Sequence, residues 1–378
     1  MHPDFMLTDE VVFLNHGSFG ACPRPVFEVY QAWQREAERQ PVAFFQRRYD
    51  GLMDEARGHL ADYVGADVDS LAFVVNATEG LNAVAWSLPW AEGDEILTSE
   101  HEYGALELTW QAIGRRYGTR LVRQPIPLPL SSPQAFVDAL WRGVTPRTRA
   151  IFLSHITSPT ALIFPVAEVC RRARQEGLWT IIDGAHALGQ IPLDLRALGA
   201  DFYSGNAHKW LCAPKGSAFL YVRPEWHDLI RPLAVSWGCR PNSTFAQRMQ
   251  WQGTRDIAAY LSVPAAIAYQ RDHDWEAVRG ACHALACQVH ARIGALTGLA
   301  PLSPAQRDYF VQMVALPLPP CDPVILKARL LDEYRVEIPI TQYTTADGQT
   351  RHLVRASFQA YNAQADVDAL VEGLTKLL

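Results

Sequence analysis

The chain has 378 residues, of which 49% are hydrophobic and 20% are charged. Its 11 Trp, 13 Tyr and 15 Phe supply far more apolar surface than a disordered chain carries, and its length predicts two or three domains. The 34 basic and 40 acidic residues leave a net charge of -6, which excludes the strongly basic character of most nucleic-acid-binding proteins. A small-molecule substrate and a second copy of the chain are therefore the expected partners.

The sequence also carries no signal for membranes or secretion. No run reaches the ~18 consecutive apolar residues that a membrane span requires. The first ten residues include Asp4, Asp9 and Glu10, where a secretion signal would be basic and then apolar. Seven dispersed cysteines without a CxxC pair indicate reduced thiols rather than a disulfide framework or a zinc ribbon. These features predict a cytoplasmic protein.

Between residues 71 and 223, short apolar runs alternate with segments of helical period, which is typical of a mostly parallel sheet covered on both faces. The apolar runs predict seven strands, at Leu71–Asn76, Glu95–Ser99, Thr119–Arg123, Ala150–His155, Leu178–Asp183, Asp201–Ser204 and Ala218–Val222. Two amphipathic helices are predicted between them, at Tyr103–Tyr117 and Val166–Glu176. The expected fold class is α/β.

After Asp256 the pattern changes to a block of helices and strands, which predicts a separate, smaller α+β domain. A long helical stretch is expected as far as Leu296. It is followed by a strand, a helix, a strand and a closing helix, at Tyr309–Ala315, Pro323–Tyr334, His352–Phe358 and Gln364–Leu377. Pro125–Pro133 and Leu316–Pro320 are expected to be loops.

Three common motifs are missing. No G-x-G-x-x-G follows the first strand and no G-x-x-x-x-G-K-[ST] occurs, which argues against a dehydrogenase and against a P-loop protein. The segment His16–Gly20 has histidine in place of the first glycine of the G-x-S-x-G elbow, which argues against an α/β-hydrolase.

A lysine and a carboxylate follow two of the predicted strands. Lys209 lies in the polar segment Ser204–Trp210, and Asp183 ends the strand before it. A lysine amine can form a Schiff base with pyridoxal phosphate, and a carboxylate against the pyridine nitrogen keeps that ring protonated and able to accept electrons. Taken singly, Lys209 would be a surface lysine and Asp183 an ordinary strand-end aspartate.

Two further junctions between a strand and a helix suit the same cofactor. At Asn76–Gly80, backbone N–H groups and the Thr78 hydroxyl can bind an anion, although a simple helix cap has the same sequence. At Ser99–Gly104, Tyr103 offers an aromatic face for a flat ring, with a core aromatic as the alternative.

With these residues the chain resembles the class V aminotransferase-like, fold-type I pyridoxal phosphate enzymes, and within them the isopenicillin N epimerase group. The resemblance runs nearly end to end. It rests on short segments in family order, at Leu14–Gly20, Asn76–Thr78, His101–Tyr103, Thr157–Thr160, Asp183–His186, His208–Trp210, Gly253–Arg255 and Arg355–Asn362.

The resemblance implies pyridoxal 5'-phosphate as cofactor, Lys209 as the Schiff-base lysine, Asp183 at the pyridine nitrogen and Tyr103 stacked on the ring. Further cofactor contacts implied by it are Ala77, Thr78, Asn206 and His208 at the phosphate, Ser158 and His186 on the ring hydroxyl side, and Thr254 from the second subunit of a homodimer. His186 is also implied to be catalytic. Arg355 matches the arginine that forks onto the substrate carboxylate, with Asn15, His16 and Gly17 beside the substrate.

The resemblance further implies a large domain with a mostly parallel seven-stranded sheet and a smaller α+β C-terminal domain. We assign residues 1–20 to a segment that packs at the active site, 21–255 to the large cofactor-binding domain and 256–378 to the small domain. The active site is expected at the carboxyl ends of the strands, between the domains.

One departure from the family concerns cysteine desulfurases, which carry a nucleophilic cysteine shortly before the substrate arginine. The corresponding stretch, Val336–Thr341, has no thiol, and persulfide chemistry needs one. Cys321 lies earlier and is interpreted as structural. His186 stands where desulfurases typically have glutamine, which also argues against that activity.

The expected reaction begins when the freed Lys209 amine removes the α-proton of an amino acid or a short peptide. Epimerisation is ranked first, and it needs a second acid for which Tyr103 or His16 is the candidate. A C–S lyase of the kind found in thiol-histidine biosynthesis is ranked second and a transaminase third. A non-catalytic binding subunit is the alternative class, but such relatives usually lose the lysine or the ring-nitrogen acid first.

Two other groups of residues have weaker interpretations. His283, Cys287 and His290 share one helical face but lack a fourth ligand, so a buried helix face is preferred to a metal site and no metal is expected. The pair Arg47 and Arg48 is either a solvated edge or part of the mouth of the active site. The loops Arg39–Arg48 and Thr341–Gln349 are expected to select the substrate side chain.

Overall fold

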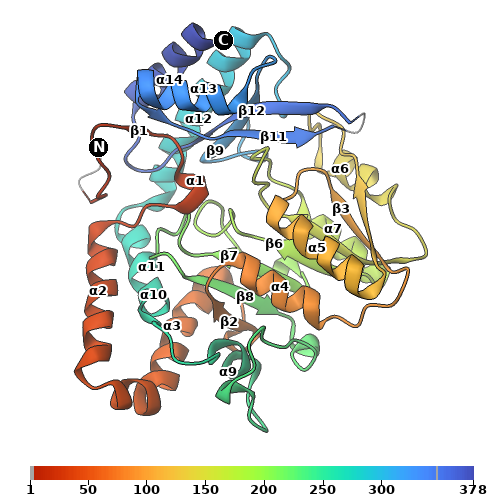
Figure 1. Ribbon diagram of the computed structural model, residues 1–378, viewed down its shortest axis with the longest axis vertical. Helices are drawn as coiled ribbons and strands as arrows, with labels where there is room; N and C mark the ends of the chain where they lie inside the picture. Colours follow the sequence, from red (N-terminus) through yellow and green to blue (C-terminus); the bar gives the residue numbers. More distant parts are fainter. Residues whose placement is uncertain (1–3, 346–347) are drawn as a thin grey trace.

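The computed structural model describes residues 4–345 and 348–378 (Figure 1). Residues 1–3 of the predicted N-terminal segment and residues 346–347 of the predicted loop Thr341–Gln349 lie outside the described residues. In the described part of the chain, no helix is both long and apolar enough to cross a bilayer.

A seven-stranded sheet forms the centre of the larger part of the molecule, in the order β2-β8-β7-β6-β5-β3-β4. Strands β7, β6, β5, β3 and β4 run parallel, while β8 is antiparallel to both of its neighbours. The predicted mostly parallel sheet of seven strands is therefore confirmed. The strands span β2 (Leu71–Val74), β3 (Glu95–Ser99), β4 (Arg120–Gln124), β5 (Thr148–Ser154), β6 (Trp179–Asp183), β7 (Phe202–Asn206) and β8 (Ala218–Val222).

The central strands are buried along almost their whole length because helices cover both faces of the sheet. In β5, Ala150 and Phe152 join the apolar cluster on one face, while Ile151 and Leu153 join the cluster on the other. This alternation is the period of two that a strand imposes on its side chains. It explains why the strands appear in the sequence as continuous apolar runs.

Two long helices pack on the first face, α4 (Ala77–Ser87) and α5 (Gly104–Tyr117), together with α9 (Phe245–Gln250). The opposite face is covered by α3 (Tyr49–Val64), α6 (Pro133–Trp141), α7 (Val166–Gln175) and α8 (Leu195–Leu198). Against α3 pack the π-helix η1 (Ala43–Arg48), α10 (Ala258–Leu261) and α11 (Val263–Asp272), and α2 (Arg24–Arg39) packs on α10 and α11.

A second, antiparallel sheet of order β11-β12-β9 lies at one end of the molecule, at the top of Figure 1. Its strands are β9 (Met313–Pro317), β11 (Ile340–Thr344) and β12 (Thr350–Ser357), and the helices α12 (Trp275–Thr297), α13 (Pro323–Tyr334) and α14 (Gln364–Leu377) share its apolar core. A smaller C-terminal α+β unit is therefore present. The exact boundaries at residues 20 and 255 stay predictions.

Three expectations for this C-terminal part were wrong in detail. The long helical stretch is divided into α10, α11 and α12, and Asp274 at the start of α12 has a left-handed φ of 43°. Strand β9 begins at Met313 rather than Tyr309, because Tyr309 and Phe310 still bond back to Gln306 in a turn. It continues to Pro317, inside the predicted loop Leu316–Pro320, and β11 was not predicted.

The N-terminal segment joins the two sheets. Strand β1 (Val12–Phe13) pairs with β10 (Val336–Glu337), and the backbone N–H of Ser357 in β12 donates to the carbonyl of Leu14. The short helix α1 (His16–Phe19) follows, and Figure 1 shows it between the sheets. Its end, Gly20, brings the chain against the loop that carries Lys209.

Replacing Gly20 with alanine should destabilise the protein. Gly20 has a φ of 72°, and a Cβ there would lie 2.0 Å from the carbonyl oxygen of His208. Gly93→Ala is the matched control, since Gly93 has a φ of 84° with nothing near its Cβ position. We expect a loss of about 3 kcal/mol in unfolding free energy for Gly20→Ala and about 1 kcal/mol for the control, measured in urea. Equal losses would contradict the close contact.

Candidate active site

The parallel strands place the chemical groups at one edge of the sheet. Ser154 at the end of β5 pairs with Asp183 at the end of β6, and Asp183 pairs with Ser204 near the end of β7. The loops that follow parallel strands in register leave the sheet at the same edge, where α/β enzymes bind ligands. Residues separated by tens of positions in the chain therefore meet there.

Lys209 lies in the loop after β7, and its Nζ is 3.1 Å from Nε2 of His186. Burial lowers the pKa of Lys209 to about 8, the positive charge of Arg355 adds to this effect, and Asp183 opposes it. A much larger fraction of this amine is unprotonated at neutral pH than in an ordinary lysine, which suits a nucleophile.

Asp183 ends β6 and is 4% exposed. Its Oδ1 accepts a hydrogen bond of 2.9 Å from the backbone N–H of Ala185. Burial raises the pKa of Asp183, while the bond from Ala185 and the charge of Lys209 lower it. Gly184 is required next to it, because a Cβ there would lie 2.1 Å from the Tyr203 ring. The structure thus brings together the predicted residues Lys209, Asp183 and His186.

The N-terminus of α4 and the end of β7, where an anion site was predicted, lie side by side. Oδ1 of Asn206 accepts from the backbone N–H of Ala77 at 2.8 Å, so its NH2 group is the half that can bind an anion. Thr78 is the second residue of α4, where the helix dipole favours negative charge. Nδ1 of His208 donates to the carbonyl of Ser217, and burial lowers the pKa of His208 to about 4. A phosphate dianion would raise that pKa and make Nε2 a further donor.

Arg355 in β12 is a buried cation, 4% exposed, that has no carboxylate partner among the described residues. Its Nη1 donates to the carbonyl and the hydroxyl of Ser158, at 2.6 and 3.1 Å, and its Nη2 donates to the hydroxyl of Ser18 at 3.2 Å. Its Nε has no partner in that part of the chain, and burial lowers the pKa of Arg355 to about 10. Buried charges are normally paired, so this guanidinium is suited to an incoming carboxylate.

Tyr103 and Thr254 occupy different surroundings. Tyr103 caps the start of α5 and is 45% exposed, so its ring is available to a ligand at this edge. Thr254 is exposed and lines a cavity of about 860 Å³ together with Tyr49, Trp237 and Trp251. None of Lys209, Asp183 and His186 lines that cavity. The structure thus places Thr254 at a cavity that these three residues do not line, and its predicted role in a neighbouring subunit stays a prediction.

His16 lies behind the lysine loop rather than in an open site. Its ring is fully buried, with Nδ1 2.9 Å from the Tyr361 hydroxyl and Nε2 donating to the backbone carbonyl of Lys209 at 3.0 Å. Burial lowers the pKa of His16 to about 3. Both nitrogens are engaged, which favours a role in holding the loop over the predicted roles as second acid and substrate contact.

The neighbours of His16 are also tightly packed. A Cβ on Gly17 would lie 2.9 Å from the sulfur of Met313 and 3.0 Å from the hydroxyl of Ser357. Oδ1 of Asn15 accepts from the hydroxyl of Ser18 at 2.5 Å, and Ser18 in turn contacts Arg355. Asn15 is therefore linked to Arg355 through Ser18. Direct contact of Asn15 and Gly17 with substrate stays a prediction.

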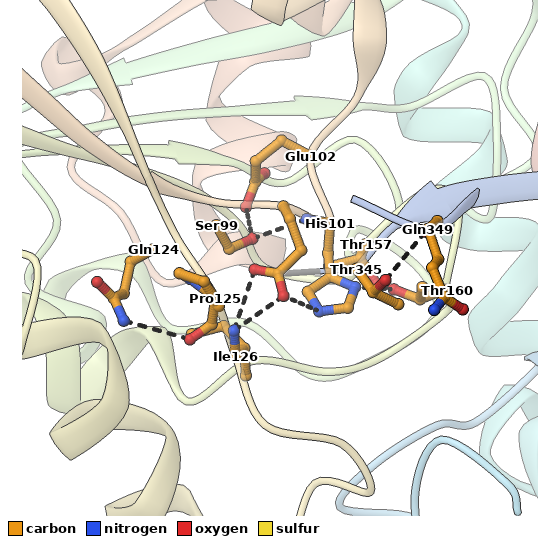
Figure 2. A network of polar contacts seen from close by, with 11 residues as sticks. Ser99, His101, Glu102, Gln124, Pro125, Ile126, Thr157, Thr160, Thr345 and Gln349 are labelled. Carbon is orange, nitrogen blue, oxygen red and sulfur yellow. Dashed lines mark hydrogen bonds and ion pairs between the residues drawn. The ribbon is translucent and has the colours of Figure 1, made fainter. Parts of the chain in front are cut away.

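Glu102 received no role in the sequence analysis, although its side chain is buried and contacts Ser99 (Figure 2). Its carboxylate accepts from the hydroxyl of Ser99 at 2.7 Å and from the N–H and hydroxyl of Ser154 at 2.8 and 2.6 Å. The ladder between β3 and β5 ends at Leu97 and Ile151, so Glu102 joins the two strands where backbone pairing stops. The three-residue spacing from Ser99 to Glu102 is that of a capping box and is a signal that could have identified it.

His101 in the same turn connects the two sheets. Its Nδ1 is 3.2 Å from the hydroxyl of Thr160, and its ring stacks on Tyr343 of β11 with centroids 5.4 Å apart (Figure 2 shows the contact with Thr160). Burial lowers the pKa of His101 to about 3, so the ring is neutral.

The helix face of His283, Cys287 and His290 has ordinary contacts. The sulfur of Cys287 is 3.4 Å from Nε2 of His283, while Nε2 of His290 donates to the carbonyl of Ser303. The described residues contain no cluster of three or more His, Cys, Asp or Glu side chains that could hold a metal. All seven cysteines are free thiols. On the surface, Arg48 pairs with Glu36 at 2.7 Å.

Comparison with known proteins agrees with this geometry. The sequence profile of the family described as Aminotransferase class-V matches residues 24–370. The chain is 38% identical to an isopenicillin N epimerase of Amycolatopsis lactamdurans and 33% identical to one of Streptomyces clavuligerus, in each case over 98% of this chain and 96% of the relative. It is 30% identical to putative L-cysteine desulfhydrase 2 of Oryza sativa subsp. japonica, over 97% of this chain and 85% of the relative.

Solved structures share the fold. An apo cysteine desulfurase from Thermococcus onnurineus NA1 matches with a TM-score of 0.82 and 22% identity, over 99% of this chain and 96% of that chain. A lysine mutant of C-DES, with glycine covalently linked to its pyridoxal phosphate cofactor, matches with a TM-score of 0.83 and 23% identity, over 97% of both chains.

The fold and the site define a fold-type I enzyme that depends on pyridoxal phosphate. The chain belongs to the class V aminotransferase family, and pyridoxal 5'-phosphate is its cofactor. The side chains fit that group, since the edge of the sheet offers an amine, a buried carboxylate, anion donors at α4 and an unpaired guanidinium.

Glu102 should make the stability of the protein depend on pH. Burial raises the pKa of Glu102 from 4.5 to about 7, and the serine hydrogen bonds oppose the shift only in part. Between these two values the native state binds more protons than the unfolded state, so stability falls as pH rises. Glu102→Gln cannot ionise. Between pH 5 and pH 8, we expect the unfolding free energy of the wild type to fall by about 3 kcal/mol relative to that of this variant, as measured by urea unfolding. A difference that does not change with pH would contradict the shift.

Proposed function

We propose that the enzyme acts at the α-carbon of an amino acid or an amino-acid-containing small molecule, with epimerase or racemase chemistry of the isopenicillin N epimerase type. The observation that carries this proposal is the convergence of the Lys209 amine, the Asp183 carboxylate and the unpaired Arg355 guanidinium on one edge of the sheet. Support for epimerisation comes from the two epimerases at 38% and 33% identity over nearly the full chain.

Pyridoxal phosphate supplies an aldehyde that bonds amines and a ring that withdraws electrons from the substrate α-carbon. The partly unprotonated Lys209 amine would bind the aldehyde, and after exchange with substrate it would accept the α-proton. Asp183 would hold a proton on the ring nitrogen, whose positive charge favours the carboxylate form of this residue. Thr78, Asn206 and the backbone of Ala77 at α4 would bind the phosphate.

Arg355 would orient the substrate, since Ser18 and Ser158 fix its guanidinium in one position and leave Nε for the incoming carboxylate. Tyr103 would cover one face of the cofactor ring, and its hydroxyl is the remaining candidate for the second acid because His16 is enclosed. Ser158 and His186 would lie on the side of the ring hydroxyl.

A C–S lyase is the second candidate. A rice relative at 30% identity is described as a putative L-cysteine desulfhydrase. Elimination at the β-carbon begins with the same removal of the α-proton by Lys209, so the site described above serves either reaction. Persulfide transfer of the desulfurase type is disfavoured because Val336–Thr341 contains no cysteine. Transamination is the third candidate, and a non-catalytic subunit is disfavoured because Lys209 and Asp183 are both retained.

The reaction can be identified by incubating the purified enzyme with D- and L-amino acids, cysteine conjugates and small peptides in D2O. Epimerisation predicts product of inverted configuration that carries one deuterium at the α-carbon, detected by NMR and chiral chromatography. Release of sulfide and pyruvate would establish the lyase instead, and an oxo acid the transaminase. Lys209→Ala should slow α-proton exchange by about 10³-fold. Exchange at the wild-type rate in this variant would contradict the assigned base.

Homodimerisation with Thr254 in the neighbouring site is part of the proposal, and it can be tested by mixing variants. Lys209→Ala and Thr254→Ala each impair both sites of their own dimers. If Thr254 acts across the interface, a mixed dimer has one intact site, so mixing equal amounts should restore about a quarter of the wild-type activity. Unfolding and refolding the two together allows exchange, and each variant refolded alone is the control. No recovery, with mixed dimers shown by mass spectrometry, would place Thr254 in its own site.

A further inference from the structure

Three side chains form a short chain of hydrogen bonds that ends at the catalytic amine. Nε1 of Trp210 donates to Nδ1 of His186 at 3.2 Å, and Nε2 of His186 is 3.1 Å from Nζ of Lys209. Trp210 is fully buried, its ring lies 5.1 Å from that of His16, and its carbonyl accepts from Gln270 at 2.8 Å. The indole is therefore held rigidly.

Counting donors and acceptors fixes the protonation of this chain. An indole N–H only donates, so Nδ1 of His186 must be the acceptor and cannot carry a proton. A neutral imidazole with no proton on Nδ1 carries it on Nε2, which therefore donates to Lys209. An ammonium group has three donors and no acceptor, so the partner of this N–H has to be the free amine.

The surroundings agree with a neutral pair. Burial lowers the pKa of His186 well below its usual value, and the charges of Lys209 and Arg355 act in the same direction. Around Lys209, Arg355 disfavours the ammonium form and Asp183 favours it. The hydrogen bond from His186 also affects the protonation of Lys209, and its effect depends on which ring nitrogen of His186 carries the proton.

We propose that Trp210 is a positioning residue that fixes His186 in the tautomer with the proton on Nε2, and so favours the free-base form of the Lys209 amine, which can accept that hydrogen bond. The inference deepens the proposed function because it concerns the same amine. A free base is the form that can attack an aldehyde carbon or accept a proton. The effect is independent of which reaction follows.

The first test uses the wild-type protein without cofactor. Nitrogen NMR of histidine-labelled protein distinguishes a protonated from an unprotonated ring nitrogen, and the signals missing in His186→Gln assign those of His186. We expect the proton on Nε2 at pH 9, above the Lys209 pKa of about 8, where the amine is mostly unprotonated. A proton on Nδ1 would overturn the proposal whether or not any Trp210 variant folds.

The second test measures the amine in Trp210→Phe, which keeps an aromatic ring but has no N–H. His186 is then free to place its proton on Nδ1 and to accept from a lysine ammonium. We expect the pKa of Lys209 to rise by about one unit, which lowers its rate of trace acetylation at pH 7 about tenfold. Peptide mass spectrometry follows acetylation across pH, and the half-exposed Lys327 in the same protein is the internal reference.

His186→Gln provides the matched background. The glutamine amide can accept from Trp210 with its oxygen and donate to Lys209 with its NH2, and it has no tautomers. Trp210→Phe should therefore change the acetylation of Lys209 much less in the His186→Gln protein than in the wild type. Equal changes in both backgrounds would mean that Trp210 acts only through packing and would overturn the proposal. Because these readouts need no cofactor and no turnover, they stay separate from a failure of the proposed function.

Discussion

The register of three parallel strands is the constraint on which the site depends. Ser154, Asp183 and Ser204 stand side by side at the ends of β5, β6 and β7. The carboxylate and the lysine loop lie on this line, and Glu102, in the turn after β3, is bonded to it through Ser154. A slip of one residue in β6 would turn Asp183 to the other face of the sheet. Burial of these strands on both faces fixes the register. The packing of the core therefore also determines where the side chains of the site lie.

Burial disfavours the charged form of three ionisable groups at this edge. It lowers the pKa of Lys209 and of Arg355 and raises that of Asp183, so each charged form is destabilised in the protein alone. A cofactor with a phosphate, a ring nitrogen and a bound amino-acid carboxylate offers a partner to each kind of group. The site is thus electrostatically incomplete by itself, which is the usual cost of preorganised charges at functional sites.

Much of this arrangement could be predicted from the sequence. The seven strands of the main sheet were predictable because they lie between polar turns. The meeting of Asp183 with the loop of Lys209 was predictable because each comes at the end of such a strand or just after it. Contacts that depend on tertiary packing were not predictable. His16 looks like an open glycine-rich turn in the sequence, yet β9, β12 and Trp210 enclose its segment. Trp210 looks like a core residue, and only its direction toward His186 reveals a polar role.

The N-terminal segment has a consequence for how the protein is made. Residues 12–18 are anchored by β10, β12 and Arg355, all of which lie more than 300 positions later in the chain. Residues 12–18 therefore cannot form these contacts until residues 336–357 have been synthesised. Until then the main sheet can assemble without the contacts of residues 12–18 behind the lysine loop, since contacts between residues so distant in sequence form late. The segment behind the lysine loop can therefore take its final place only after the C-terminal residues that hold it have been synthesised.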